Sequence, residues 1–365
     1  MSLLQREQSH KEAANDSRFF CYTHKYQQPI IIEKHQNIFS VHCDGKTVQQ
    51  WSFSKGQPVA ILQLEGSFNS TIEQQYTATL AMLENVFSNC QQLTTLILHN
   101  TAVEIRQKLQ KTGIVLSTST SLDNDNMVIS ADLFWQQPAL WLNSDRDTHY
   151  PLHYIISNEK RHPQRPPQVN ELVYSRYIPW LKKSLTFYTV DIERDLNTIN
   201  QWMNKPSVAE FYDEEGDLNY HKNYLQKQLN DPHTLPLIGY FDNQPFGYFE
   251  VYWTKEDRIS PFYQADDFDR GWHMLVGDEN FRGKSWFIAW CSSIIHFMFL
   301  DDCRTQRIIC EPRHDHPKLI KNLDRFGFSK IKEFDFPHKR SMLLILLRDQ
   351  FFEKKMMTNY INANF

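Results

Sequence analysis

A turn rich in glycine and basic residues separates two apolar segments of the chain. The turn is Asn280–Ser285, with Arg282, Gly283 and Lys284 at its centre, and it is followed by Trp286–Leu300, a segment without proline or glycine. That second segment has the composition of a buried helix. The backbone N–H groups at a helix start, together with the positive end of the helix dipole, favour a bound anion. An exposed basic turn without a ligand has the same sequence, so both interpretations stay open.

A histidine lies just before this turn, in the short apolar segment Trp272–Val276. His273 is four residues before Gly277, so a strand here would hold the imidazole close to the anion turn. Histidine is the side chain whose unperturbed pKa is nearest neutrality, which suits a proton acceptor. A histidine packed in the core with no chemical role is the alternative.

Carboxylates and aromatic rings gather in the predicted strand Gln244–Trp253 and in the acidic loop after it. Strand alternation places Glu250 and Tyr252 on the same face. An ammonium group is bound by such carboxylates and aromatic faces, whereas a solvated acidic surface is the equally favoured alternative. The candidate substrate-binding residues are Glu250, Tyr252, Trp253, Asp269 and Trp202.

Periodicity predicts the elements that position these residues. The expected strands are Val173–Ile178, Leu185–Val190, Leu235–Phe241, Gln244–Trp253, Trp272–Val276, Arg307–Glu311, Ile331–Phe336 and Met342–Arg348. The expected helices are Asp191–Met203, His221–Leu229, Ser285–Leu300 and Pro317–Phe326. Strands that alternate with helices in this way predict an α/β fold.

A series of short blocks occurs in a fixed order between about residues 172 and 350. The blocks are Trp202–Asn204 with Pro206, Val208 and Phe211; Gly247–Trp253; Glu256-Asp257; Asp269–Gly271; His273–Gly277; Phe281–Gly283; Phe299–Asp302; Glu311–Arg313 with Asp315; and Phe334–Arg340. In this order they resemble the GCN5-related N-acetyltransferase (GNAT) superfamily. Within it they resemble the siderophore N-hydroxy-amine acyltransferases of the aerobactin and alcaligin type. The anion turn departs from the superfamily pattern at Asn280 and Ser285, where Gln or Arg and a second Gly or Ala are usual.

The resemblance implies a C-terminal GNAT fold and acetyl-CoA as cosubstrate. The implied reaction is acetylation of the hydroxylamine nitrogen of an N-hydroxyputrescine-like diamine or of N6-hydroxylysine, which forms a hydroxamate for siderophore biosynthesis. Three alternatives stay open: a succinyl-CoA-dependent enzyme, a general amine or polyamine acetyltransferase, and an acyl-CoA-binding protein without catalysis.

The resemblance also implies residue roles. His273 would accept the proton, and Asp315 would orient the imidazole or contact the nucleophile, unless Asp315 only caps the helix at Pro317. Backbone N–H groups near Val276 and Gly277 would polarise the thioester carbonyl. The expected coenzyme-binding residues are Met274, Val276, Arg282, Gly283, Lys284 and Ser285.

Composition limits the partners. The net charge is −4, which predicts neither nucleic-acid nor membrane binding. The six cysteines show no metal-ligand spacing, and no metal is expected. Trp286–Leu300 is too short for a membrane span, and the polar first residues are unlike a signal peptide. A cytoplasmic monomer or homodimer that binds acyl-CoA and a small amine is therefore expected.

The chain is long enough for two domains. Residues 1–17 are predicted to be disordered, and 18–160 to form an N-terminal α/β domain that is a scaffold or a degenerate copy of the acyltransferase fold. The proline-rich stretch 161–171 is predicted to be a connector, and 172–365 the catalytic domain.

Overall fold

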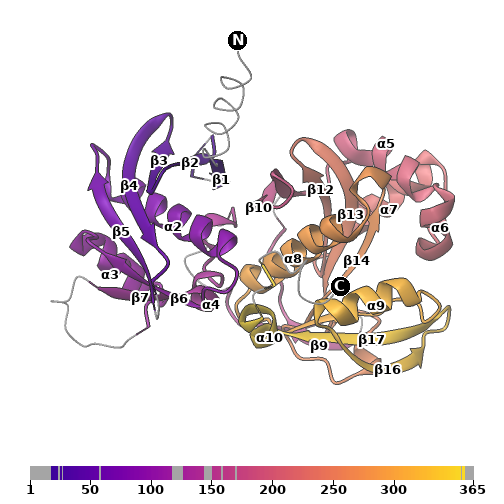
Figure 1. The fold of residues 1–365 in the computed structure, drawn as a ribbon. Helices are drawn as coiled ribbons and strands as arrows, with labels where there is room; N and C mark the ends of the chain where they lie inside the picture. Colours follow the sequence, from indigo (N-terminus) through magenta and orange to yellow (C-terminus); the bar gives the residue numbers. More distant parts are fainter. Residues whose placement is uncertain are drawn as a thin grey trace, which may run out of the picture. The chain divides into compact units, whose positions relative to one another are not determined.

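The chain folds as two compact units, Met1–Trp141 and Leu142–Phe365, drawn in indigo to magenta and in pink to yellow in Figure 1. The computed structural model describes residues 18–357, except 24, 27, 57–58, 117–125, 144–149, 158, 169–170 and 355. The predicted N-terminal segment, residues 1–17, lies outside the described residues.

The division between the units falls earlier than the sequence predicts. The hairpin of β8 (Tyr154–Ser157) and β9 (Lys160–Pro163) belongs to the second unit. After it, the guanidinium of Arg165 donates to both carboxylate oxygens of Glu256, at 2.5 and 2.6 Å, and lies 4.3 Å over the ring of Trp253. This ion pair holds the proline-rich stretch against the second unit, which is why the stretch is not a free connector.

The first unit is built on a seven-stranded sheet in which the strands follow sequence order. Its last pairs are parallel between β5 and β6 and antiparallel between β6 and β7. The elements are β1 (Arg18–Cys21), β2 (Ile30–His35), β3 (Ile38–Cys43), β4 (Lys46–Ser54), β5 (Ala60–Ser67), α2 (Ile72–Asn89), β6 (Thr95–His99), α3 (Val103–Lys111), β7 (Met127–Ser130) and α4 (Ala131–Phe134).

The second unit is built on an eight-stranded sheet in the order β10-β11-β12-β13-β14-β15-β17-β16. Its strands are β10 (Leu172–Ile178), β11 (Lys183–Thr189), β12 (Thr234–Phe241), β13 (Gln244–Trp253), β14 (Arg270–Val276), β15 (Arg307–Cys310), β16 (Ser329–Asp335) and β17 (Arg340–Leu347). Its helices are α5 (Ile192–Met203), α6 (Pro206–Tyr212), α7 (Leu218–Asn230), α8 (Lys284–Asp301), α9 (Pro317–Phe326) and α10 (Arg348–Glu353).

Both units repeat one order of elements: antiparallel strands, an 18-residue helix, then a strand parallel to the last one. The prediction of an α/β fold is confirmed, and the first unit has the topology expected of a copy of the second. The two long helices begin differently, however. In the first unit the side chain of Thr71 and that of Gln74 cap helix α2 reciprocally, so the amides that an anion would use are already bonded. A scaffold role for this unit remains a prediction.

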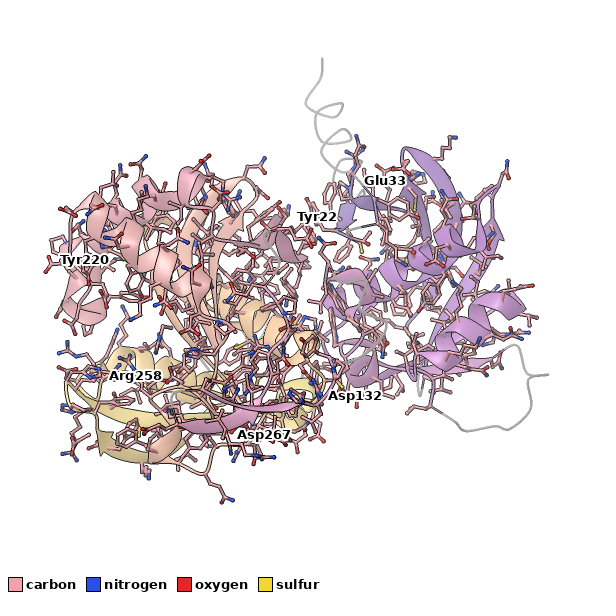
Figure 2. The ribbon with its side chains drawn as sticks, turned by 180° about the vertical axis from the view of Figure 1, so that it is seen from behind. Tyr22, Glu33, Asp132, Tyr220, Arg258 and Asp267 are labelled. Atoms are coloured by element: carbon pink, nitrogen blue, oxygen red, sulfur yellow. The ribbon has the colours of Figure 1, made fainter. Side chains whose placement is uncertain are left out.

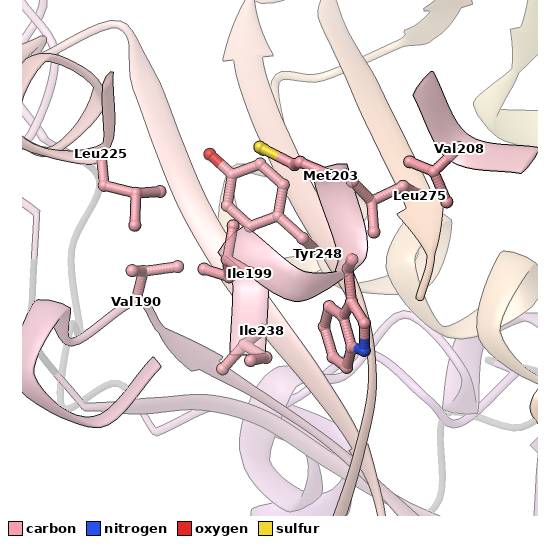
Figure 3. Packing of buried hydrophobic residues seen from close by; sticks show 9 residues of the cluster. Val190, Ile199, Met203, Val208, Leu225, Ile238, Tyr248 and Leu275 are labelled. Atoms are coloured by element: carbon pink, nitrogen blue, oxygen red, sulfur yellow. The ribbon is translucent and has the colours of Figure 1, made fainter. Parts of the chain in front are cut away.

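The sheet of the second unit is covered on both faces (Figure 1). On one face, Phe249 packs against Trp290 of α8, with ring centroids 6.1 Å apart. On the other, Tyr248 lies in a buried cluster with residues of α5, α6 and α7. Figure 3 shows this cluster, which consists of Val190, Ile199, Trp202, Met203, Val208, Leu225, Ile238, Tyr248 and Leu275. Because side chains alternate along a strand, Glu250 and Tyr252 share the face of Tyr248.

The indole ring of Trp202, a member of this cluster, packs directly against Gly277, just after the end of β14. A Cβ atom at Gly277 would overlap the indole ring of Trp202. We therefore expect Gly277→Ala to lower the free energy of unfolding of the second unit by about 1–3 kcal/mol through overpacking. Chemical denaturation measures the change. Gly66→Ala in β5 of the first unit controls for an added methyl group without a clash, because its Cβ meets no atom nearer than 3.8 Å. Unchanged unfolding of the second unit in Gly277→Ala would contradict the packing argument.

Candidate active site

A cavity of about 330 Å³ opens where strands β14 and β15 separate. The two strands are paired in parallel at Arg270–Ile308 and Gly271–Ile309. Beyond these pairs, β15 ends and Pro312, which has no backbone N–H, cannot extend a ladder. The cavity is lined by His273–Val276 on the β14 side and by Cys310–Arg313 on the other.

His273 stands in this cavity between two glutamates. Its Nδ1 lies 3.2 Å from Oε2 of Glu250, and its Nε2 lies 2.6 Å from Oε1 of Glu311. The imidazole side chain is 25% exposed, whereas those of Glu250 and Glu311 are 6% and 1% exposed. The histidine is thus the member of the cluster that a ligand can reach.

The two carboxylates change the acid–base behaviour of the imidazole. Burial alone would lower the pKa of His273, but the charges and hydrogen bonds of Glu311 and Glu250 outweigh it and raise the pKa to about 9. Burial likewise opposes ionisation of both glutamates, yet the bonds to His273 hold the pKa of each below its ordinary value. At neutral pH the cluster therefore holds an imidazolium between two carboxylates.

Tyrosines fix the glutamates. The hydroxyls of Tyr224 and Tyr248 both donate to Oε1 of Glu250, the latter at 2.9 Å. The hydroxyl of Tyr252 donates to Oε2 of Glu311 at 2.9 Å. Each carboxylate therefore has one oxygen bonded to tyrosine hydroxyls, two at Glu250 and one at Glu311, and one oxygen that contacts the histidine, so the imidazole is held in one orientation.

Comparison with known proteins agrees with this geometry. A family model described as an acetyltransferase (GNAT) domain matches residues 191–336. A protein of Schizosaccharomyces pombe, provisionally named a lysine N-acyltransferase, is 44% identical over 228 residues, or 62% of this chain and 68% of the relative. The chain belongs to the GNAT acyltransferase family. It is therefore an enzyme of the acyl-CoA N-acyltransferase class, as the sequence predicts.

Two further relatives define the group within the GNAT family. The N(6)-hydroxylysine O-acetyltransferase of Escherichia coli is 40% identical, over 62% of this chain and 71% of its own. The N(5)-hydroxyornithine:cis-anhydromevalonyl coenzyme A-N(5)-transacylase of Beauveria bassiana is 41% identical, over 53% and 43%. Among solved structures, an aminoglycoside acetyltransferase with bound coenzyme A is 20% identical, with a TM-score of 0.43, over 47% of this chain and 98% of its own.

Asp315 does not reach the histidine of this GNAT site. Its carboxylate accepts from the guanidinium of Arg313 at 3.0 and 2.8 Å, and it is exposed outside the cavity lining. Nor does it cap helix α9, because the side chain of His316 accepts from the amide of Leu319 at 3.4 Å. Glu311, four residues earlier in the same block, makes the contact with the imidazole that the sequence predicts for Asp315.

The predicted coenzyme residues lie along the cavity and at its end. Met274, Val276 and Arg282 line it. Gly283, with φ of 109°, turns the chain into α8 in a conformation that favours glycine, and no side chain of the described residues caps this helix. Lys284 and Ser285 form the first turn of α8, where the positive end of the helix dipole favours an anion. In contrast, the amide of Gly277 already donates to the carbonyl of Phe246 at 2.9 Å, which removes it as an oxyanion donor.

Of the predicted substrate-binding residues, Glu250 lines the cavity and Tyr252 lies directly behind Glu311. Trp253 lies between the guanidinium groups of Arg165 and Arg270, at 4.3 and 4.0 Å. The other two residues, Asp269 and Trp202, lie outside the cavity lining: Asp269 is paired with Arg307 at 2.7 Å and Trp202 is in the core. The acidic loop is thus largely engaged in internal ion pairs.

Sequence reasoning assigned no role to several residues that the fold brings into the cavity. They are Glu311, Tyr224, Arg258 and Trp272. A glutamate at the end of a strand does not by itself predict a role in a site, because only the register with β14 places Glu311 opposite His273.

No group of three or more potential ligands that could hold a metal ion occurs in the part of the chain that the structure describes. Within the same residues, no helix is long and apolar enough to cross a membrane.

Proposed function

We propose that this acyltransferase transfers an acetyl group from acetyl-CoA to the hydroxylamine nitrogen of an N-hydroxylated alkyl amine. The product is a hydroxamate, whose two hard oxygens suit ferric iron, as siderophore biosynthesis requires. The observation that carries the proposal is the Glu250–His273–Glu311 cluster in the cavity between β14 and β15. The names of the Escherichia coli and Beauveria bassiana relatives, which specify hydroxylysine and hydroxyornithine, support the acceptor class.

The nucleophile needs little activation. A hydroxylamine nitrogen is less basic than an alkyl amine, so it is largely neutral at pH 7 and attacks the thioester carbonyl directly. The C–N bond forms, the C–S bond breaks and the coenzyme leaves as a thiolate. The nitrogen loses one proton as the intermediate collapses, and this proton needs an acceptor in the site.

His273 is that acceptor in the proposed mechanism. The shorter bond, 2.6 Å to Glu311, fixes Nε2 as a donor, so Nδ1 gives up its proton when the imidazole becomes neutral. The longer contact of Nδ1, 3.2 Å to Glu250, is the one that the nucleophile replaces. Glu311 stabilises the imidazolium that forms.

The coenzyme would lie along the backbone of β14. Met274 and Val276 line the cavity there, and the start of α8 with Arg282 follows directly. Arg282 and the positive end of the α8 dipole would bind the pyrophosphate, which leaves the thioester beside His273.

Thiol release from acetyl-CoA tests the proposal. We expect turnover with N6-hydroxylysine or N-hydroxyputrescine and at least tenfold lower kcat/KM with lysine and putrescine. A red complex with ferric iron distinguishes the N-acyl product from an O-acyl ester. Equal turnover of putrescine would indicate a polyamine acetyltransferase. Acetyl-CoA binding without turnover of any acceptor, also with succinyl-CoA, would indicate a binding protein.

A further inference from the structure

Two cations face the cavity from connections between strands. Arg258 lies on the connection from β13 to β14, and Lys339 on the turn between β16 and β17; both line the cavity. The guanidinium carbon of Arg258 is 5.5 Å and the Nζ of Lys339 is 5.6 Å from the ring centroid of Phe336. Two positive groups thus share one aromatic ring. Figure 2 labels Arg258 on the second unit.

These cations differ from the other two side chains of their kind in the cavity. Arg282 is paired with Glu279 at 3.1 Å, and Arg313 with Asp315 at 2.8 Å. No carboxylate of the described residues lies within 4.0 Å of Arg258 or Lys339. Both oxygens of Glu311 are already bonded, one to His273 and one to Tyr252.

Two like charges held together with no carboxylate in ion-pair contact favour an anionic ligand. Burial lowers the pKa of Lys339 most; the charge of Glu311 opposes it, and the charges of Arg258 and Arg313 lower the pKa further. Burial, Arg258 and Lys339 lower the pKa of His338 in the same way. A carboxylate bound between the two cations would relieve this repulsion with charge-assisted hydrogen bonds.

The position of Arg258 separates it from the phosphates of the coenzyme. The segment with Arg258 leaves the sheet after Trp253, which is paired with Arg270 at the beginning of β14. The coenzyme turn follows Val276, at the other end of that strand. The coenzyme turn also has its own cation, Arg282, so the anion at Arg258 and Lys339 is a different one.

We propose that Arg258 and Lys339 bind a carboxylate of the acceptor, which makes the acceptor an N-hydroxylated amino acid rather than a diamine. This inference rests on the proposed function, because it takes the ligand beside His273 to be the hydroxylamine. It assigns two specificity-determining residues, one from each connection.

Two acceptors that differ only in the carboxylate test the inference: N6-hydroxylysine and N-hydroxycadaverine. With the wild type, we expect kcat/KM to be roughly 10- to 100-fold higher for hydroxylysine, the range of a hydrogen bond to a charged group. Arg258→Gln and Lys339→Met should each remove most of this preference by raising KM for hydroxylysine, with KM for hydroxycadaverine unchanged. Lys330→Met is the control, because Lys330 is exposed and paired with Asp324.

Calorimetric binding of both acceptors is measured in parallel, so that the two proposals fail separately. Equal kcat/KM and equal affinity of the wild type for the two acceptors would overturn the inference and leave the proposed function intact. Tighter binding of hydroxylysine without turnover would contradict the proposed reaction but would support binding of the acceptor carboxylate by Arg258 and Lys339. If the variants lose only the use of succinyl-CoA, the cations bind the acyl group and the inference is wrong.

Discussion

Replacement of His273 by alanine is expected to lower kcat/KM for a hydroxylamine acceptor by about two to four orders of magnitude, the range for loss of a general base. The affinity for acetyl-CoA should stay within about twofold, because the turn at Arg282 and Gly283, which we propose binds the pyrophosphate, is untouched. Steady-state thiol release gives the first quantity, and calorimetry with acetyl-CoA gives the second.

The chain offers a closely matched control for this variant. His233 also lies between two carboxylates, 2.5 Å from Asp231 and 3.6 Å from Asp257, and its pKa is likewise raised to about 9. It does not line the cavity of His273. His233→Ala should therefore keep kcat/KM within a few-fold. Equal losses in both variants would show that the activity depends on a buried ion pair and not on a base in the cavity.

Replacement of Glu311 by glutamine is expected to lower kcat/KM by about 100-fold at the pH optimum and to move the optimum. Glutamine cannot supply the charge that holds the imidazolium at Nε2, so the pKa of His273 should fall from about 9 toward its ordinary value near 6.5. Only the neutral imidazole accepts a proton. In the wild type, kcat/KM should rise about tenfold per pH unit between pH 7 and 9 and then level off.

In Glu311→Gln the same rise should end nearer pH 7, because its midpoint follows the pKa of His273. The hydroxylamine is uncharged throughout this range, so the profile reports the enzyme. Glu256→Gln is the control for loss of a buried carboxylate, since Glu256 is paired with Arg165 outside the cavity. A wild-type profile that is flat from pH 7 to 10 would contradict the role of His273 as the base.

The sequence by itself determined the family and the strands of the main sheet of the second unit, together with helices α5, α7, α8 and α9 but not α6 or α10. Hydrophobic periodicity predicted β13, β14 and α8 to within a few residues, because burial of an apolar face is a local pattern. The order of the blocks, with His273 before the turn at Gly283, indicated the GNAT resemblance that the relatives confirm.

Only the tertiary structure decided which acid meets the histidine. Asp315 and Glu311 lie in one block, and nothing in the spacing distinguishes them. The parallel register of Gly271 with Ile309 places Glu311 opposite His273, whereas Asp315 lies past the end of the strand and pairs with Arg313. Register is set by long-range packing between strands, which a local pattern does not contain.

The same reason explains the residues that sequence reasoning placed in the substrate site and the fold placed elsewhere. Asp269 is acidic and Trp253 is aromatic, as an ammonium site requires. In the folded chain, however, Asp269 forms an ion pair with Arg307, and the guanidinium of Arg165 lies over the ring of Trp253. Conversely, the sequence did not predict a role for Arg258, because its place beside Lys339 depends on two connections that meet only in the folded sheet. The residue types were local information, and their neighbours were decided by the fold.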